Sequence, residues 1–355
     1  MRVFVGLSGG VDSSLTAALL VEQGYDVTGV YMKNWSQDLP GMKCPWQEDY
    51  QDAKRVAVQL GIPFKLYDFE AEYREKVVDY MLDGYQRGIT PNPDIMCNQE
   101  VKFKLFLEAA LADGADMIAT GHYARVVPSS AAPNAASLHM AANLDKDQTY
   151  FLYRVTKEAL GRSLMPIGEF TTKAEVRAEA EKRGLATARK KDSQGICFVG
   201  KVGIKDFLLH ELGEQPHGDI LDQNCVRIGE HDGAIFYTIG QRQGLGVGGG
   251  LPYYVTGKNM AKNEVYVTTD LQDSGLWCDT LHLAELHWIN EPPQPGKTYQ
   301  VRTRYRAELV PATFTQDDQN NRGELHLEQA VRAVTPGQSA VLYDNTRVLG
   351  GGIAT

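Results

Sequence analysis

The feature that most constrains this chain is the serine- and glycine-rich segment SGGVDSS at residues 8–14. It directly follows a short apolar run and directly precedes an amphipathic stretch, so it lies between an expected strand and an expected helix. Two glycines let the backbone approach an anion closely, while N–H groups of the helix N-terminus and the hydroxyls of Ser8 and Ser13 can donate hydrogen bonds. The segment predicts a phosphate-binding loop.

The acidic residue of this loop adds a second expectation. Asp12 would repel a bare phosphate, so its presence indicates a bridging Mg²⁺ that a carboxylate and phosphate oxygens share. The chain lacks the G-x-x-x-x-G-K-[ST] pattern of the common NTPase loop at this place. The plainer alternative is a serine–glycine turn with a capping aspartate.

The first 125 residues alternate short apolar runs with helical stretches, which predicts a doubly wound parallel sheet in an α/β domain. The ligand of such a sheet lies at the carboxyl ends of its strands, where the SGGVDSS loop falls. The expected strands are Val3–Leu7, Asp26–Met32, Pro63–Phe69 and Met117–Thr120, and the expected helices are Ser13–Gln23, Glu48–Leu60, Ala71–Gln86 and Val101–Ala112.

After residue 125 the regular alternation of apolar runs and helical stretches ends. We expect residues 128–142 to form an exposed insertion and residues 172–183 a helix. Glycine-rich turns and short β-type runs, Ala234–Ile239 and Glu264–Thr269, follow from about residue 203. Residues 278–355 alternate with the strand period, which predicts a small antiparallel barrel or sandwich. The expected domains are residues 1–202, a small central domain at 203–275 and a β domain at 276–355.

Composition bounds the functional classes. A length of 355 residues suits two or three domains, and no apolar run is long enough to span a membrane. The N-terminus is typical of a buried strand and not of a signal peptide, so we expect a cytoplasmic protein without membrane contact. The net charge of −9 argues against nucleic-acid binding without excluding a local basic face.

A formal G-x-G-x-x-G match at residues 244–249 has neither a strand before it nor a helix after it. We therefore expect no dinucleotide site there, and a loop that closes over a substrate or partner instead.

The five cysteines show no C-x-x-C spacing, which argues against a zinc site and predicts no metal centre. Cys97 lies in NPDIMCN, a loop expected between two helices, and its proximity to Asp94 favours chemistry. Cys197 lies in DSQGICF after three basic residues that can lower a thiol pKa. A structural role is the alternative for both, and we expect it for Cys44, Cys225 and Cys278.

Seven segments in order make the pattern specific. Together they resemble the bacterial tRNA-specific 2-thiouridylase family of the ATP pyrophosphatase superfamily, and they span residues 6 to 305. The segments are residues 6–14, 92–98, GHYA at 121–124, KDQTY at 146–150, 192–198, YTIGQR at 237–242 and Arg304-Tyr305. The resemblance implies an adenine nucleotide alpha hydrolase-like domain, a small central domain and a C-terminal antiparallel β-barrel that contacts tRNA.

The resemblance also implies a reaction, in which ATP adenylates the C2 oxygen of the wobble uridine, pyrophosphate leaves, and sulfur replaces the oxygen. It implies that Cys197 carries the persulfide, that Cys97 is its partner in a transient disulfide, and that Asp94 is a general acid or base. An aspartate has an ordinary pKa of about 3.9, so an acid role requires a raised pKa. The implied ATP-binding residues are Gly6, Leu7, Ser8, Gly9, Gly10, Val11, Asp12, Ser13, Met32 and Gly121.

The implied tRNA-contacting residues are Asn92, Pro93, Asp94, Lys146, Asp147, Gln148, Arg304 and Tyr305. The implied co-substrate is ATP with Mg²⁺, without a permanent cofactor, and the implied partners are tRNA and a persulfide-donating sulfur carrier protein. For Arg304 and Tyr305, a solvated strand face is the alternative. Three rival functions stay open: an adenylating enzyme for a small metabolite, a 4-thiouridine synthase, and a non-catalytic nucleotide-sensing or RNA-binding module.

Overall fold

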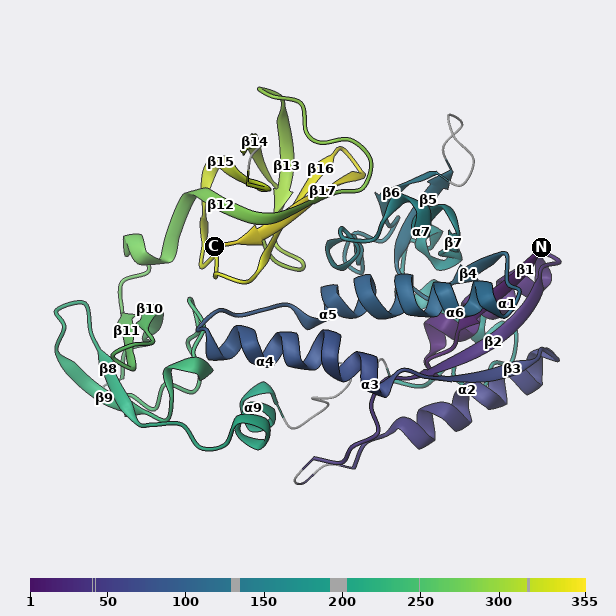
Figure 1. The fold of residues 1–355 in the computed structure, drawn as a ribbon, viewed down its shortest axis with the longest axis horizontal. Coiled ribbons are helices and arrows are strands. Elements are labelled where there is room, and N and C mark those ends of the chain that lie inside the picture. The colour runs from purple at the N-terminus through teal and green to yellow at the C-terminus, as the bar shows by residue number, and fades with distance from the viewer. Residues whose placement is uncertain (40, 42, 129–134, 192–202, 249, 318–319) are drawn as a thin grey trace.

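The N-terminal strands form a five-stranded parallel sheet in the order β3-β2-β1-β4-β7 (Figure 1). The structure is a computed structural model that describes all residues except 40, 42, 129–134, 192–202, 249 and 318–319. The four expected strands are confirmed to within one or two residues, and the short β7 extends the sheet. The strands are β1 (Arg2–Gly6), β2 (Asp26–Lys33), β3 (Phe64–Asp68), β4 (Met117–Ala119) and β7 (Ser163–Leu164).

Apolar side chains on both faces of β1 explain why helices cover both sides of this sheet. Val3 and Val5 lie in one cluster with residues of α1 (Val11–Glu22) and α2 (Trp46–Leu60). Phe4 belongs to a second cluster on the opposite face. Since successive strand residues point to opposite faces, β1 is buried on both, and the expected doubly wound α/β arrangement is confirmed.

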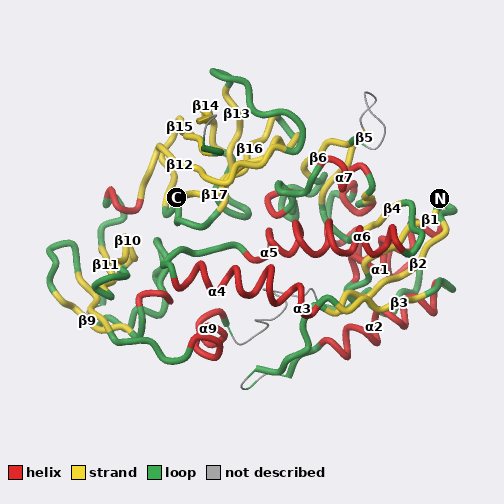
Figure 2. Tube along the Cα trace, in the orientation of Figure 1, coloured by secondary structure: helices red, strands yellow, loops and turns green. Residues whose placement is uncertain are grey.

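Two long helical runs contribute many residues to the second cluster and cross the middle of the molecule (Figures 1 and 2). Each run contains a π segment, labelled η, inside an otherwise α-helical stretch. The first run is α3 (Glu70–Tyr73), η1 (Arg74–Val78) and α4 (Asp79–Gln86), and the second is α5 (Pro93–Met96), η2 (Cys97–Leu105) and α6 (Phe106–Ala112).

The second run begins eight residues before the predicted start at Val101, so the prediction that Cys97 lies in a loop is wrong. The Asn92 side chain accepts a hydrogen bond from the Ile95 N–H at 3.4 Å, and Pro93 occupies the first helical position. A capping asparagine followed by proline is a helix start, although the same pair also occurs in turns.

The C-terminal strands form a closed antiparallel barrel, which decides between the barrel and the sandwich. Its order is β12-β15-β14-β13-β16-β17, and pairing between β12 and β17 closes it. Alternate residues such as Leu325, Leu327 and Leu342 fill the interior. The strands are β12 (Trp277–Trp288), β13 (Thr298–Arg302), β14 (Val310–Asp317), β15 (Arg322–Arg332), β16 (Ser339–Asp344) and β17 (Arg347–Ala354).

The prediction of an exposed insertion at residues 128–142 is wrong for its second half. The hairpin of β5 (Ala124–Pro128) and β6 (Ala136–Met140) joins the barrel sheet, because β6 pairs with the start of β17. Leu138 is fully buried, opposite Val348. The alanine- and serine-rich composition concealed an alternating burial pattern typical of a half-buried strand.

The central region contains helix α9 and a four-stranded sheet in the order β10-β11-β8-β9. The expected strand Glu264–Thr269 is confirmed as β11, whereas the expected run Ala234–Ile239 is wrong, because residues 234–236 form a 3₁₀ turn. The elements are α9 (Ile204–Leu212), β8 (Gly218–Leu221), β9 (Arg227–His231), β10 (Tyr254–Asn259) and β11 (Glu264–Thr268).

Thr90, two residues before Asn92, is a junction of all three regions. Its N–H donates to the Pro336 carbonyl at 2.8 Å, and its carbonyl accepts from the Gln338 amide at 2.8 Å. Its hydroxyl lies 3.2 Å from that of Thr238 in the central region. The backbone that leads into NPDIMCN is therefore fixed by the barrel and the central region together.

We expect Gly337→Ala to lower the free energy of unfolding by roughly 1–3 kcal/mol. Gly337 has a φ of +95°, and a Cβ added there would lie 2.8 Å from the Thr90 carbonyl carbon and oxygen. The matched control is Gly296→Ala, where φ is +75° but no atom lies within 4 Å of the added Cβ. Chemical denaturation should show the larger loss for Gly337→Ala, and equal losses would contradict close packing at Thr90.

Candidate active site

The SGGVDSS segment turns from β1 into α1 at the carboxyl edge of the parallel sheet. The Ser8 N–H donates to the Ser13 hydroxyl at 3.1 Å, the two hydroxyls lie 3.2 Å apart, and the Ser13 hydroxyl donates to the Gly10 carbonyl at 3.2 Å. Among the described residues, the N–H groups of Gly9, Val11 and Asp12 have no acceptor. Hydrogen bonds within the loop thus hold it open, with donors free for an anion.

The side chains of Leu7 and Val11 are buried, so these two residues can meet a nucleotide only through the backbone. A Cβ added at Gly6 would lie 2.9 Å from the Met32 methyl group, which places Met32 beside the start of the loop. A Cβ at Gly9 would lie 2.4 Å from the Asp49 carbonyl oxygen. The first turn of α2 therefore packs on the loop, which the sequence did not indicate.

Gly121 follows β4, the neighbour of β1, and packs against the start of α1. A Cβ at this position would lie 2.7 Å from the Ser13 nitrogen and 2.8 Å from the Asp12 carbonyl carbon. Only glycine fits this approach. Asp12 and Ser13, the last two of the six predicted ATP-binding positions from Ser8 to Ser13, thus meet Gly121. The contact lies at the point where the strand order reverses, which is the usual ligand site of such sheets.

Asp12 is surrounded by two partners that the sequence did not reveal as such. One oxygen of its carboxylate accepts from the Tyr123 hydroxyl at 2.8 Å, and its two oxygens accept from the Lys173 ammonium at 2.7 and 2.8 Å. Lys173 is the first residue of α8 (Lys173–Lys182), close to the predicted helix 172–183. Only the tertiary fold brings this lysine to the loop, because 161 residues separate it from Asp12.

Cys97 is the first residue of the π segment η2 and is buried. Phe103 in the same segment lies 5.7 Å, ring centre to ring centre, from His122, the residue after Gly121. Phe106 at the start of α6 lies beside Gly6. One helical run therefore links Cys97 to the nucleotide loop, and π segments are frequent at functional sites.

Asp94 lies in the first turn of α5, three residues before Cys97. Burial raises its pKa above the ordinary value, and the positive charge of Lys102 opposes this rise. The pKa of Asp94 is therefore shifted in the direction that an acid role requires.

Asn98, next to Cys97, donates from its amide to the Phe151 carbonyl at 3.2 Å, while its buried Oδ1 has no protein partner among the described residues.

The predicted tRNA-contacting segment 146–148 turns two of its residues inward. The Asp147 side chain is fully buried and accepts from the Arg302 guanidinium at 3.0 Å and from the Thr149 hydroxyl at 2.7 Å. The Gln148 side chain accepts from the Tyr123 N–H at 2.9 Å. Direct tRNA contact stays a prediction for all three residues, and in this structure Asp147 and Gln148 connect the nucleotide loop to the barrel.

Arg304 and Tyr305 lie in a turn after β13, so the alternative of a solvated strand face is wrong. The Tyr305 ring lies 4.6 Å, centre to centre, from Phe151, whose carbonyl accepts from Asn98. The Arg304 guanidinium donates to the Ala333 carbonyl at 2.6 Å. The fold thus brings this turn next to the helical run that carries Cys97.

Cys197 and the rest of DSQGICF lie outside the described residues, so the distance between Cys97 and Cys197 is not defined. Before this segment, Lys190 donates to Asp49 and Asp52 of α2, at 2.7 Å each. Because Asp49 packs on Gly9, this ion-pair cluster fixes Lys190 beside the SGGVDSS loop.

Cys44 is buried and Cys278 is partly buried, as expected for structural residues, and burial raises the pKa of both thiols. Cys225 is exposed in a turn, so the expectation of a packing role is wrong for it. The described part of the G-x-G-x-x-G match, residues 244–248, has neither a strand directly before it nor a helix directly after it, as the sequence predicted.

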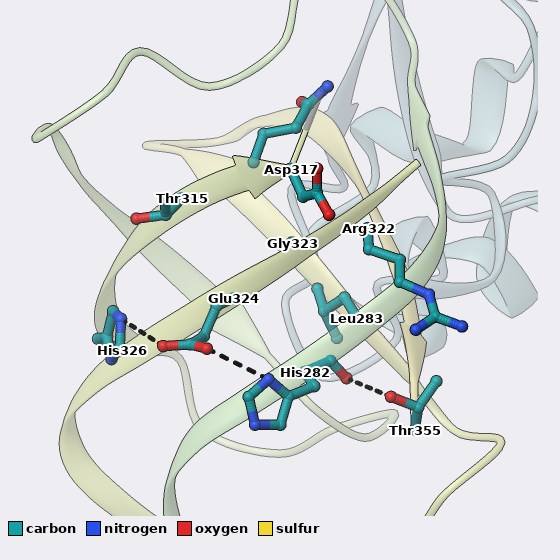
Figure 3. Close-up of a pocket in the computed structure, with 10 residues that line it drawn as sticks. His282, Leu283, Thr315, Asp317, Arg322, Gly323, Glu324, His326 and Thr355 are labelled. Carbon is teal, nitrogen blue, oxygen red and sulfur yellow. Dashed lines mark hydrogen bonds and ion pairs between the residues drawn. The ribbon is translucent and has the colours of Figure 1, made fainter. Parts of the chain in front are cut away.

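A surface groove of about 510 Å³ lies on the barrel and contains none of the predicted site residues (Figure 3). Its centre is Glu324, whose carboxylate contacts His282 at 3.2 Å and His326 at 2.8 Å. Across the described ranges, no group of three or more His, Cys, Asp or Glu side chains is arranged to hold a metal ion, and no helix is long and apolar enough to cross a membrane.

Comparison with known proteins agrees with this geometry. Family models match residues 1–201 (tRNA methyl transferase HUP domain), 205–269 (tRNA methyl transferase PRC-barrel domain) and 278–354 (Aminomethyltransferase beta-barrel domain). The tRNA-specific 2-thiouridylases MnmA of Enterococcus faecalis and Bacillus subtilis are 44% and 46% identical, each over 99% of this chain and 94% of the relative. That of Bacillus velezensis is 47% identical over the same shares.

The chain belongs to the tRNA-specific 2-thiouridylase family. The family resemblance predicted from seven motifs is thereby confirmed over nearly the whole length. The structure also shows the expected order of domains, which is a parallel sheet, a central domain and a closed barrel. The single carboxylate of Asp12, beside free N–H groups, fits a Mg²⁺ that arrives with a nucleotide, because such an ion takes one or two carboxylates and phosphate oxygens.

We expect the free energy of unfolding of Asp94→Asn, relative to that of the wild type, to increase as pH rises. A raised pKa in the folded protein means that the protonated form is favoured, so stability present below the unfolded pKa of about 3.9 is lost as pH rises through the folded value. Asparagine has no charge to lose. Free energies of unfolding of variant and wild type, measured from pH 4 upward, should therefore diverge in favour of the variant.

The control for this series is Asp83→Asn, whose side chain is 62% exposed on α4. Its stability difference from wild type should show no such rise. A difference for Asp94→Asn that shrinks with rising pH would mean that the site stabilises the carboxylate instead.

Proposed function

We propose that the protein catalyses ATP-dependent 2-thiolation of the wobble uridine of tRNA. The observation that carries the proposal is identity of 44–47% to tRNA-specific 2-thiouridylases over 99% of the chain, together with a phosphate loop and Cys97 on connected elements. The three regions divide the work: residues 1–202 hold the chemistry, residues 203–275 form the central domain, and residues 276–355 contact tRNA.

Activation by ATP suits this substrate. The C2 carbonyl of uridine is amide-like, so it is a poor electrophile and its oxygen is a poor leaving group. Transfer of AMP to that oxygen releases pyrophosphate and converts the oxygen into a good leaving group. The free N–H groups of Gly9, Val11 and Asp12 and the hydroxyls of Ser8 and Ser13 are suited to hold the departing pyrophosphate.

The glycine contacts and Asp12 complete the nucleotide site in this proposal. Gly6 and Gly121 let the nucleotide lie close to the backbone, and Met32 borders the same space. The Asp12 carboxylate is placed to hold a Mg²⁺ that neutralises phosphate charge. No permanent cofactor is needed, because ATP and sulfur are consumed in each turnover.

Sulfur transfer then requires two thiols. Cys197 carries a persulfide, whose terminal sulfur bonds to the activated C2 while the C2–oxygen bond breaks and AMP leaves. The Cys97 thiolate attacks the Cys197 sulfur and breaks the sulfur–sulfur bond. The transferred sulfur is reduced, the two cysteines are oxidised to a disulfide, and an external thiol must reduce that disulfide before the next cycle.

Asp94 has a raised pKa and lies three residues from Cys97, so it is suited to hold a proton near the base that reacts. Asn92 and Pro93 shape the entry to this turn. Lys146, Asp147 and Gln148, with Arg304 and Tyr305, are the proposed tRNA contacts. Tyr305 next to Phe151 offers an aromatic surface for an unstacked nucleotide.

The remaining partners follow from the chemistry. A sulfur carrier protein donates persulfide sulfur to Cys197, and tRNA in the cytoplasm provides the uridine that is modified. A small-metabolite adenylating enzyme needs neither the cysteine pair nor the barrel, and the full-length match to 2-thiouridylases disfavours it.

We expect Cys97→Ser and Cys197→Ser each to lower thiolation by roughly a hundredfold or more, because each removes a thiol that forms or breaks a bond. The purified protein is incubated with unmodified tRNA, Mg-ATP and a persulfide donor. Pyrophosphate release is assayed, and nucleosides from the digested tRNA are analysed by mass for 2-thiouridine.

Cys225→Ser, a change at an exposed thiol, is the control and should retain activity. Pyrophosphate without 2-thiouridine would move the function to another adenylating reaction. A 4-thiouridine product would assign the rival synthase, and full activity in either catalytic variant would contradict the two-cysteine route.

A further inference from the structure

The Lys173 ammonium group occupies the position where a cation would bind Asp12. Its Nζ lies 2.7 Å from one oxygen of the Asp12 carboxylate and 2.8 Å from the other. The Lys173 side chain is 16% exposed and that of Asp12 is 31% exposed, so this ion pair is partly shielded from water. An ion pair in such a place is stronger than an exposed surface pair.

The position of Lys173 is built by the fold. Thr172 caps α8, and the Thr172 hydroxyl and the Glu175 carboxylate form a reciprocal capping box that fixes the first turn. Val176 and Ala180 of α8 pack in one apolar cluster with Val11 and Leu15 of α1. The helix that presents Lys173 is thus held directly against the helix that begins at the phosphate loop.

Tyr123 adds a second restraint on this ion pair. Its hydroxyl donates to Asp12 at 2.8 Å, and the Lys173 ammonium lies 5.5 Å from the centre of its ring. The cation is therefore held between a carboxylate and an aromatic face. Because Tyr123 is 3% exposed, its ring cannot move away from the lysine readily.

We propose that Lys173 is an exchangeable counter-ion, which neutralises Asp12 in the nucleotide-free protein and transfers to the phosphates when a divalent cation and nucleotide bind. This inference rests on the proposed use of ATP. A lysine suits the exchange, because its ammonium has three donors on a flexible four-carbon stem and acts as a point charge. The first turn of α8 can stay in place while only the ammonium moves.

Electrostatic repulsion favours an exchange of Lys173 over an ion pair with Asp12 that persists when a divalent cation binds. A divalent cation at Asp12 and the ammonium of Lys173 repel each other, so both cannot contact the same carboxylate at low cost. Phosphate oxygens held by the N–H groups of Gly9, Val11 and Asp12 provide a new partner within the same loop. Asp12 and Lys173 each have a partner of opposite charge before and after the exchange, so the Asp12 carboxylate does not face the incoming phosphates unpaired.

The exchange predicts that one variant binds a divalent cation more tightly and pyrophosphate more weakly. In Lys173→Met, loss of the competing ammonium should raise the affinity of nucleotide-free protein for Mn²⁺ by about tenfold, measured by electron paramagnetic resonance. The same change should lower the affinity for inorganic pyrophosphate in the presence of Mg²⁺ by about tenfold or more, measured by calorimetry. A lysine that only supports the fold would lower both affinities.

Three further variants make the test decisive. Lys182→Met removes a lysine from the same helix, with a side chain that is 74% exposed, and should change neither affinity. Asp12→Asn combined with Lys173→Met should abolish the gain in Mn²⁺ binding. If Lys173→Met does not fold, as judged by circular dichroism, Lys173→Gln replaces it.

An unchanged or weaker Mn²⁺ affinity in the lysine variants would overturn the exchange, and so would an unchanged pyrophosphate affinity. A gain in Mn²⁺ affinity that survives Asp12→Asn would overturn it as well. A wild-type protein that binds no pyrophosphate at all would instead overturn the proposed use of ATP, and the exchange with it.

Discussion

The close approach of Gly121 to the start of α1 is the contact on which the rest of the site depends. It places the residue that follows Thr120, just after β4, directly against the backbone of Asp12 and Ser13, with no space for a side chain. Because Tyr123 follows two residues later, the same approach carries its hydroxyl to Asp12. A larger residue at position 121 would push the segment after β4 away from the start of α1, and would separate Asp12 from Tyr123.

From this contact a continuous set of hydrogen bonds leads to the barrel. Tyr123 bonds Asp12 through its side chain and Gln148 through its backbone N–H, and the neighbouring Asp147 pairs with Arg302 of β13. The buried ion pair is costly to break, since removal of one partner would leave the other charged and unpaired inside the protein. Residues that resemble tRNA contacts in sequence are thus also the structural link between the nucleotide loop and the domain proposed to bind RNA.

Much of this architecture could be predicted from the chain alone, because its signals are local. The loop between β1 and α1, the alternation of strands and helices, and the strand period of the barrel all depend on neighbours in sequence. The predictions failed where distant contacts decide the structure. Residues 136–140 become a barrel strand only because β17 is available to pair with them, and Lys173 becomes a site residue only because α8 packs on α1. The helix start at Asn92 was missed for a different reason, since asparagine followed by proline fits both a cap and a turn.

The pairing of β6 with β17 has a consequence for how this protein can be divided. The sheet of the barrel does not end at the boundary of the third domain, because β5 and β6 of the first continue it beyond the start of β17 (Figure 1). Separation of the two would leave the N–H and carbonyl groups at the start of β17 unpaired, and such an open edge invites pairing with other chains. The N-terminal region therefore covers this edge of the barrel, and we expect the separated parts to aggregate more readily than the whole chain.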